Sequence, residues 1–140
     1  MRIGAEYLVP GAASGELVLL GAPLSFYGGF DVASGTISDA THPDRGTRLS
    51  GKVIAMRAAR GSSSSASALV EAARGGTAPA AIILGRLDPI LVIGALVAND
   101  LYGVAIPVLE LPESAWPSLR NGARVELDSA RPEIIIREPV

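Results

Sequence analysis

Apolar runs and helical repeats follow one another in a regular order between residues 51 and 111. Short apolar runs at 52–56, 80–84 and 106–111 predict three buried strands. Each pair of runs is separated by a segment with helical spacing. The order β-α-β-α-β favours parallel strands joined by right-handed crossovers. The pattern therefore predicts an α/β fold.

The first helical segment follows a run of four serines. Ala66, Leu69, Val70 and Ala73 fall at positions i, i+3, i+4 and i+7, which places them on one face of an α-helix. The glycine pair at 75–76 is a stop signal. We therefore expect an amphipathic helix that ends at this pair.

The second helical segment has clear signals at both ends. Asp88 is a suitable N-cap, with Pro89 at the first helical position, and Gly103 follows Tyr102. The segment is apolar on nearly all sides until its end. We therefore predict a mostly buried helix from Pro89 to about Tyr102.

The first 50 residues are less regular. Residues 16–20 predict a strand and residues 35–38 a shorter one. Glycine-containing clusters at 11–15, 28–29 and 33–35 are typical of turns. Together they indicate a small β-region with long loops.

Two further strands are expected near the C-terminus, at 123–127 and 133–138. Charged residues and proline flank both of them, which is typical of edge strands. We therefore expect one domain over 1–140, with a core at about 8–111 and a C-terminal β extension at 112–140.

Composition excludes several classes of function. Apolar residues make up 49% of the 140 residues, the net charge is −2, and no basic block is present, so we expect no nucleic-acid partner. No cysteine is available for disulfides or thiolate metal ligands. The N-terminus does not resemble a secretory signal, and the longest apolar run, 89–98, is too short to cross a membrane. We therefore predict a soluble, cytoplasmic protein.

The run GSSSS at 61–65 is open to three interpretations. Serine-rich segments are often flexible linkers, and one serine could cap the following helix. The run also lies between a predicted strand and a helix, where ligands bind in open α/β sheets. Free N–H groups, the helix dipole, serine hydroxyls and Arg60 would attract an anion there, and the same environment would stabilise a serine alkoxide.

Other common chemistries lack their motifs. GSSSS is not a G-x-S-x-G elbow, and no Gly-Lys-Ser/Thr follows the glycines of a P-loop. The only histidine, His42, lies in the turn-like THPDRG and is expected to be a loop residue. This chain alone therefore predicts no Ser-His-Asp hydrolase and no metal site.

Several segments in order resemble the small, or swivel, subunit or domain of aconitase X. The resemblance covers nearly all of residues 8–109 and is carried by LVPGAASGELVLL, PLSFYGGFD, RGTRLSGKVIAM, ARGSSSSASALVEA, GTAPAAIIL and DPILVIGALVANDLYG. It implies a swivelling β/β/α domain that closes over a separate large domain. That partner would hold an iron–sulfur cluster through cysteines, or a mononuclear iron, and the iron would act as Lewis acid toward the departing hydroxyl.

The resemblance also implies a catalytic role for one serine. In the family the first serine after the glycine is the base, which corresponds to Ser62 here. The broader aconitase motif places an arginine after the serines, whereas Ser64 stands in that stretch and Arg60 precedes it. The family's arginine contact is therefore not carried over. The remaining predicted substrate-binding residues are Arg60, Gly61, Ser63, Ser64, Ser65, Phe26, Gly28, Gly29 and Asp31, although the pair 28–29 is equally typical of a hairpin turn.

The resemblance implies a hydro-lyase that acts on a small carboxylate. The first hypothesis is dehydration of cis-3-hydroxy-L-proline to Δ1-pyrroline-2-carboxylate, because GSSSS is more similar to the bacterial branch of the family. The second is mevalonate 5-phosphate dehydratase, whose small subunits tend to carry a Gly-Ser-Thr turn. A non-catalytic anion-binding module is the alternative from another class.

Overall fold

Four parallel strands form the centre of the fold, and three of them belong to the β-α-β-α-β unit predicted from the sequence. The computed structural model describes residues 1–138. Its parallel strands are β3 (Ala12–Leu19), β6 (Val53–Met56), β7 (Ala81–Leu84) and β8 (Val108–Glu110), hydrogen-bonded in that order. The last three are joined by the helices α2 (Ser64–Gly75) and α3 (Pro89–Tyr102). The predicted β-α-β-α-β core is therefore confirmed.

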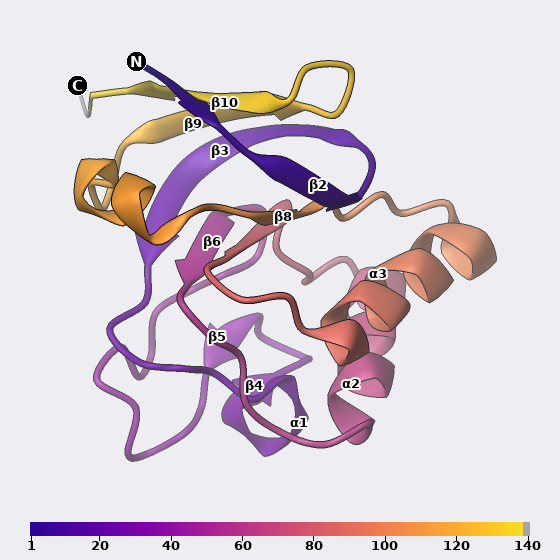
Figure 1. Cartoon of the computed structure of the whole chain (residues 1–140). Helices are drawn as coiled ribbons and strands as arrows, with labels where there is room; N and C mark the ends of the chain where they lie inside the picture. The colour runs from indigo at the N-terminus through magenta and orange to yellow at the C-terminus, as the bar shows by residue number, and fades with distance from the viewer. Residues whose placement is uncertain (139–140) are drawn as a thin grey trace.

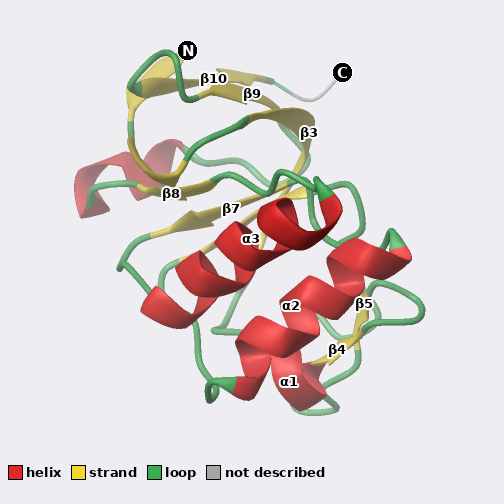
Figure 2. Cartoon of the chain, turned by 90° about the vertical axis from the view of Figure 1, so that its right-hand side faces the viewer, coloured by secondary structure: helices red, strands yellow, loops and turns green. Residues whose placement is uncertain are grey.

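The central strands are buried on both faces, which explains their continuous apolar sequences. Side chains alternate across a strand, so Val53 and Ala55 enter one hydrophobic cluster while Ile54 and Met56 enter the other. The second of these clusters also contains Leu69 of α2. The two helices lie side by side and cover that face of the sheet (Figure 2).

Both helices end at the predicted glycines, and α3 also begins at its predicted cap. Gly76 terminates α2 in the left-handed region, with φ of 80°, and its N–H donates to the last carbonyls of the helix. The carboxylate of Asp88 accepts hydrogen bonds from the N–H groups of Ile90 and Leu91, at 2.9 and 3.2 Å, and so caps α3. Gly103 ends α3, also in the left-handed region.

The prediction that α3 is mostly buried is wrong. Leu91, Gly94, Ala95 and Ala98 form its buried stripe. On the opposite side, Ile93 is 55% exposed. α3 packs closely against α2 at Gly94, where an added Cβ would lie 3.1 Å from Ala66. This contact covers only the face of α3 that carries Gly94, and the opposite face stays exposed. No helix among residues 1–138 combines the length and the hydropathy needed to cross a membrane.

A second group of strands closes the sheet into a barrel. The strand order is β1-β10-β9-β3-β6-β7-β8-β2. The outermost strands β1 (Arg2–Gly4) and β2 (Glu6–Val9) are separated only by Ala5, so one N-terminal segment pairs with both ends of the sheet (Figure 1). These two short strands were not predicted.

The C-terminal strands were predicted correctly, but their edge position was wrong. β9 (Arg124–Asp128) lies between β10 and β3, and β10 (Glu133–Arg137) lies between β1 and β9. Val125, Leu127, Ile134 and Ile136 of these strands fill the barrel interior. The C-terminal strands are therefore part of the main sheet; residues 139–140 lie outside the described residues.

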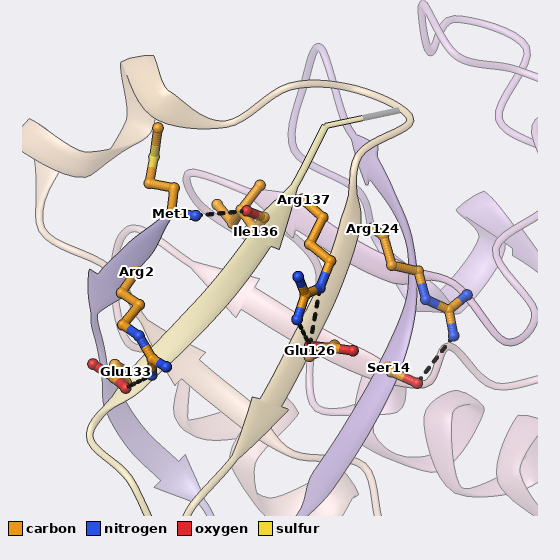
Figure 3. A network of polar contacts seen from close by, with 8 residues as sticks. All are labelled: Met1, Arg2, Ser14, Arg124, Glu126, Glu133, Ile136 and Arg137. Carbon is orange, nitrogen blue, oxygen red and sulfur yellow. Dashed lines mark hydrogen bonds and ion pairs between the residues drawn. The ribbon is translucent and has the colours of Figure 1, made fainter. Parts of the chain in front are cut away.

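The charges that suggested edges lie on the outer face of these strands. Arg2 pairs with Glu133, and Arg137 with Glu126, while Arg124 donates to the hydroxyl of Ser14 (Figure 3). The N-terminal ammonium donates to the carbonyl of Ile136 at 3.0 Å. Flanking charge here reflects a solvent-facing side and not an unpaired edge.

The remaining elements are short. They are α1 (Phe26–Gly29), β4 (Phe30–Asp31), β5 (Thr36–Ile37) and the 3-10 helix η1 (Glu113–Ser118). β5 confirms the short strand expected at 35–38. The turn expected at 11–15 is wrong, because most of that segment belongs to β3. Gly15 is required there because a Cβ would lie 2.9 Å from the carbonyl oxygen of Gly51.

Candidate active site

The serine run lies at the carboxyl end of β6 and forms the start of α2. Ser64 and Ser65 are already helical. The N–H of Ser65 donates to the carbonyl of Ser62 at 2.9 Å, and the N–H of Ala66 donates to that of Ser63 at 3.1 Å. The run is therefore an ordered strand-to-helix turn, and the linker interpretation is wrong.

Gly61 lies against two serine hydroxyls. Its φ of 116° lies in the region that favours glycine. A Cβ at this position would lie 2.4 Å from the Ser25 oxygen and 2.6 Å from that of Ser65. Glycine is therefore the residue that lets the chain pass between the segment before α1 and the helix α2.

Ser25 and Ser65 form a small hydroxyl network behind the turn. Ser25 donates to the carbonyl of Tyr27 at 2.8 Å, and its oxygen lies 3.4 Å from the hydroxyl of Ser65. Because Ser25 uses its proton on Tyr27, Ser65 is the donor between the two hydroxyls. The side chain of Ser65, 3% exposed, thus faces the protein interior. This corrects its expected contact with substrate.

Ser62 occupies the outer side of the same turn. Its side chain is exposed, and its oxygen accepts a long hydrogen bond, 3.4 Å, from the N–H of Ser64. Ser63 stands at the N-cap position of α2 but makes no side-chain capping bond. The hydroxyl of Ser62 is therefore presented to solvent at the positive end of a 12-residue helix.

Charged groups near the turn include one that sequence reasoning missed. The N–H of Arg60 donates to the carbonyl of Leu24 at 3.4 Å, while its side chain is exposed. The hydroxyl of Thr41 holds the pKa of Asp39 below its usual range, with smaller contributions from the Thr41 amide and the Arg60 charge. Asp39 lies more than 20 residues before Arg60 in the sequence, so no short-range spacing predicts that the two are close.

The segment at 26–31 is only partly near the turn. Phe26 is 1% exposed and Gly29 is buried, so neither presents a surface to a ligand, contrary to expectation. Gly28 is exposed, with φ of 84°, in the short helix α1. α1 contacts α2 and lies near one end of it in both views (Figures 1 and 2).

Asp31 lies at the wrong end of α2 for the predicted role. Next to it, the carbonyl of Val32 accepts a hydrogen bond from Thr77, which follows the C-terminus of that helix. The 12 residues of α2 separate this end from the serine turn by about 18 Å. The Asp31 carboxylate instead accepts from the hydroxyl of Ser34 at 2.7 Å, which lowers its pKa together with the Ala33 amide.

A cavity of about 450 Å³ opens at the carboxyl ends of β3 and β6, and its lining reaches Ala58 but does not include the serine run. Its lining comes from the ends of β3 and β6 and from η1, and consists of Leu19, Leu20, Gly21, Ala22, Pro23, Arg57, Ala58 and Trp116. The guanidinium carbon of Arg57 lies 5.6 Å from the centroid of the Trp116 ring. No sequence pattern had connected these two residues, which are 59 positions apart.

His42 is a structural loop residue, as predicted. Its ring is buried; Nδ1 accepts from the N–H of Asp44 at 3.0 Å, so Nε2 donates to the carbonyl of Ala22, also at 3.0 Å. Both ring nitrogens are therefore used within the loop that supports the cavity wall.

The whole arrangement agrees with one protein family. Residues 2–136 match the family described as the aconitase X swivel domain. This chain belongs to that family. The crystal structure of Thermococcus kodakaraensis aconitase X in its holo-form superposes with a TM-score of 0.87 at 28% identity, covering 99% of each chain. The expected swivel-domain fold is thereby confirmed.

Two groups of enzymes are represented among its relatives. A cis-3-hydroxy-L-proline dehydratase of Pseudomonas aeruginosa is 40% identical over 139 residues, which is 94% of this chain. The phosphomevalonate dehydratase small subunit of Pyrococcus furiosus is 32% identical, covering 97% of this chain and 96% of the relative. This swivel chain spans about a quarter, 24%, of the length of the Pseudomonas relative.

The iron expected from the sequence resemblance finds no group of ligands among the described residues 1–138 of this chain. The sequence contains no cysteine, and across residues 1–138 no three His, Asp or Glu side chains converge as metal ligands. The donor set of this chain therefore does not fit an iron centre.

Proposed function

We propose that this chain is the small subunit or domain of an aconitase X-type dehydratase and that Ser62 is its catalytic base. The observation that carries the proposal is the exposed Ser62 hydroxyl at the start of α2, on a turn that Gly61, Ser25 and Ser65 hold in place. The family membership and the named activities of the relatives support it.

Ser62 is suited to removing a proton from a carbon atom next to a carboxylate. Its alkoxide would be stabilised by the N-terminus of α2 and by the N–H of Ser64, 3.4 Å from its oxygen. The amide of Ser65 is occupied by the carbonyl of Ser62, so it shapes the turn instead of binding charge. Arg60, Gly61, Ser63 and Ser64 at the turn, and Gly28 in α1, remain the residues proposed to face the substrate, because each of them is at least partly exposed.

The proposed substrate is cis-3-hydroxy-L-proline. Ser62 takes the proton from Cα, the C–H electrons form a double bond to C3, and hydroxide leaves C3. The Ser62 proton and the hydroxide together make water, and the enamine tautomerises to Δ1-pyrroline-2-carboxylate. The 40% identity to the Pseudomonas enzyme, against 32% to the Pyrococcus small subunit, supports this choice.

Mevalonate 5-phosphate is the second candidate. The observation in its favour is length, because phosphomevalonate dehydratase small subunits from Pyrococcus furiosus and Thermococcus gammatolerans are each covered over 96%. The same turn and the same base would serve this substrate.

Activity is proposed to require a large partner with cysteines that supplies the metal, either an iron–sulfur cluster or a mononuclear iron. The name "small subunit" of several relatives supports a division into two parts. The cytoplasm is the proposed compartment. Iron would act on the leaving hydroxyl, whereas binding and proton removal are proposed for the residues described here.

The function is tested by reconstituting the complex with an aconitase X large subunit and assaying both substrates. We expect turnover of cis-3-hydroxy-L-proline, and a kcat/KM at least ten times lower for mevalonate 5-phosphate. Preference for the phosphorylated substrate would overturn the substrate assignment. A stable complex that contains iron and turns over neither substrate would favour the anion-binding module.

A further inference from the structure

One carboxylate near the serine turn is held by only one of its two oxygens. The hydroxyl and the N–H of Thr41 both donate to Oδ1 of Asp39, at 2.7 and 2.9 Å. The backbone of Asp39 is fixed as well, because its N–H donates to the carbonyl of Gly29 at 3.3 Å and its carbonyl accepts from the N–H of His42 at 3.1 Å. Among residues 1–138, no group donates a hydrogen bond to Oδ2. Asp39 is thus a fixed carboxylate with one oxygen open to a cation.

Asp39 and Arg60 both lie next to the short segment that precedes α1. A Cβ added to Gly29 would lie 3.7 Å from the Cβ of Asp39 and 3.9 Å from the Cβ of Ser25. The N–H of Arg60 donates to the carbonyl of Leu24, the residue before Ser25, at 3.4 Å. Leu24 and Ser25 are therefore the shared neighbours that bring Asp39 close to the serine turn.

The charges of Asp39 and Arg60 act on each other without forming a direct ion pair. The Arg60 charge contributes to the lowered pKa of Asp39, after the hydroxyl and the amide of Thr41, and His42 contributes less. The ion pairs within residues 1–138 do not include these two side chains. Attraction of this kind restricts the directions in which a long, exposed side chain points, and it leaves the guanidinium donors free for a ligand.

We propose that Asp39 is a positioning residue, which keeps the guanidinium of Arg60 beside the serine turn for the carboxylate of the substrate. This inference rests on the proposed function, in which Arg60 faces the substrate two residues before the base Ser62. An arginine side chain has many rotamers, and ordering it on binding costs conformational entropy. A fixed carboxylate nearby reduces that cost, because it limits the rotamers before the substrate arrives.

The inference is tested with Asp39→Asn in the reconstituted complex. Asparagine keeps an oxygen for the two Thr41 hydrogen bonds and removes only the charge. We expect the KM for cis-3-hydroxy-L-proline to rise about two- to fivefold, the effect of a partly exposed charge pair, with kcat unchanged. Asp31→Asn is the matched control, because Asp31 is also held by a hydroxyl of its own loop but lies at the far end of α2. An unchanged or lower KM in Asp39→Asn overturns the inference, since a carboxylate that only repels the substrate would give that result.

A double-mutant cycle shows whether Asp39 acts through Arg60. Arg60→Gln should raise KM by itself, and adding Asp39→Asn to it should raise KM no further. The same increase in both backgrounds would mean that Asp39 supports the loop and not the guanidinium, and it would overturn the inference. Because Asp39→Asn is compared with and without Arg60, loss of a purely structural contact does not imitate the expected result.

Titration of the side-chain carboxyl carbons by NMR, in the full chain, separates this inference from the proposed function. Arg60→Gln should raise the pKa of Asp39, because it removes a nearby positive charge, and should leave the pKa of Asp31 unchanged. An unchanged Asp39 pKa overturns the inference even if the complex dehydrates hydroxyproline. A raised Asp39 pKa in a chain whose complex turns over neither substrate supports the interaction of Asp39 with Arg60 and counts only against the proposed function.

Discussion

The hydroxyl oxygens of Ser25 and Ser65 lie 3.4 Å apart, and a Cβ added to Gly61 would lie 2.4 and 2.6 Å from them. Because Ser25 precedes α1 and Ser65 belongs to α2, this contact fixes the turn that carries Ser62 relative to two elements 40 residues apart. The position of the proposed base thus depends on tertiary contacts as well as on the local turn.

Replacing Gly61 by alanine should damage both stability and activity. The left-handed φ of 116° costs a residue with a Cβ roughly 1–3 kcal/mol, and the new methyl group would collide with both hydroxyls. We expect the free energy of unfolding to fall by about 2 kcal/mol or more, measured by urea denaturation, and kcat of the complex to fall more than tenfold.

Gly75→Ala is the matched control for this substitution. Gly75 is the last residue of α2, its φ is not positive, and no atom lies within 4 Å of an added Cβ. Alanine there should leave activity unchanged and stabilise the helix by up to about 1 kcal/mol. Equal losses in the two variants would contradict the role assigned to the Gly61 geometry.

The hydroxyl pair itself is tested by a double-mutant cycle. Ser25→Ala leaves the buried Ser65 hydroxyl without its partner, and Ser65→Ala removes that hydroxyl altogether. We expect each single variant to lose about 1 kcal/mol of unfolding free energy, and the double variant to lose less than the sum. Strict additivity would show that the two hydroxyls do not interact.

Regular elements could be predicted from the sequence because their signals are local. The helix from Pro89 to Tyr102 has its cap, its proline and its terminal glycine within 16 residues. The strand at 81–84 is apolar throughout because both faces of the sheet are covered. In contrast, the burial of α3 depends on which face meets α2, and an all-round apolar sequence does not contain that information.

Features that depend on distant partners could not be predicted. β1 and β2 are only three and four residues long, and they form strands because they pair with β10 and β8. Gly15 lies in a segment whose composition is typical of a turn. In the fold it belongs to β3, and its lack of a Cβ leaves room for the backbone of Gly51. In the candidate site, the serine turn was predicted from its position after a strand, but Ser25 and Asp39 come close to it only in the fold.

The N-cap of α3 should make a measurable contribution to stability. Asp88 accepts from the N–H groups of Ile90 and Leu91, so Asp88→Ala leaves both without this acceptor and should cost about 1 kcal/mol. Asp88→Asn retains the acceptor and should cost less. Thermal denaturation measures the difference; Asp100→Ala, an exposed position near the end of the same helix, should be nearly neutral.

The Asp31 carboxylate should make the free energy of unfolding depend on pH in the acidic range, below the usual pKa of an aspartate. The Ser34 hydroxyl lowers the pKa of Asp31 below its usual value of 3.8, so the folded state favours the charged form. Its contribution is present above pH 3.8 and is lost as pH falls through the lower pKa of the folded state.

The comparison of wild type with Asp31→Asn isolates this effect. Urea denaturation at several pH values should show the variant less stable at pH 6, with the difference shrinking below pH 3.8. A difference that stays constant or grows on acidification would contradict the hydrogen-bonded carboxylate. Activity should remain unchanged, because Asp31 lies at the far end of α2 from the serine turn.

The most direct test of the central claim is the kcat of the reconstituted complex that carries Ser62→Ala. If Ser62 is the base, turnover of cis-3-hydroxy-L-proline should fall by roughly 10²- to 10⁴-fold. Size-exclusion chromatography and metal analysis should show the same assembly as wild type, and Ser67→Ala, at an exposed position on α2, should retain normal activity. Near-wild-type turnover by the Ser62→Ala complex would contradict the account.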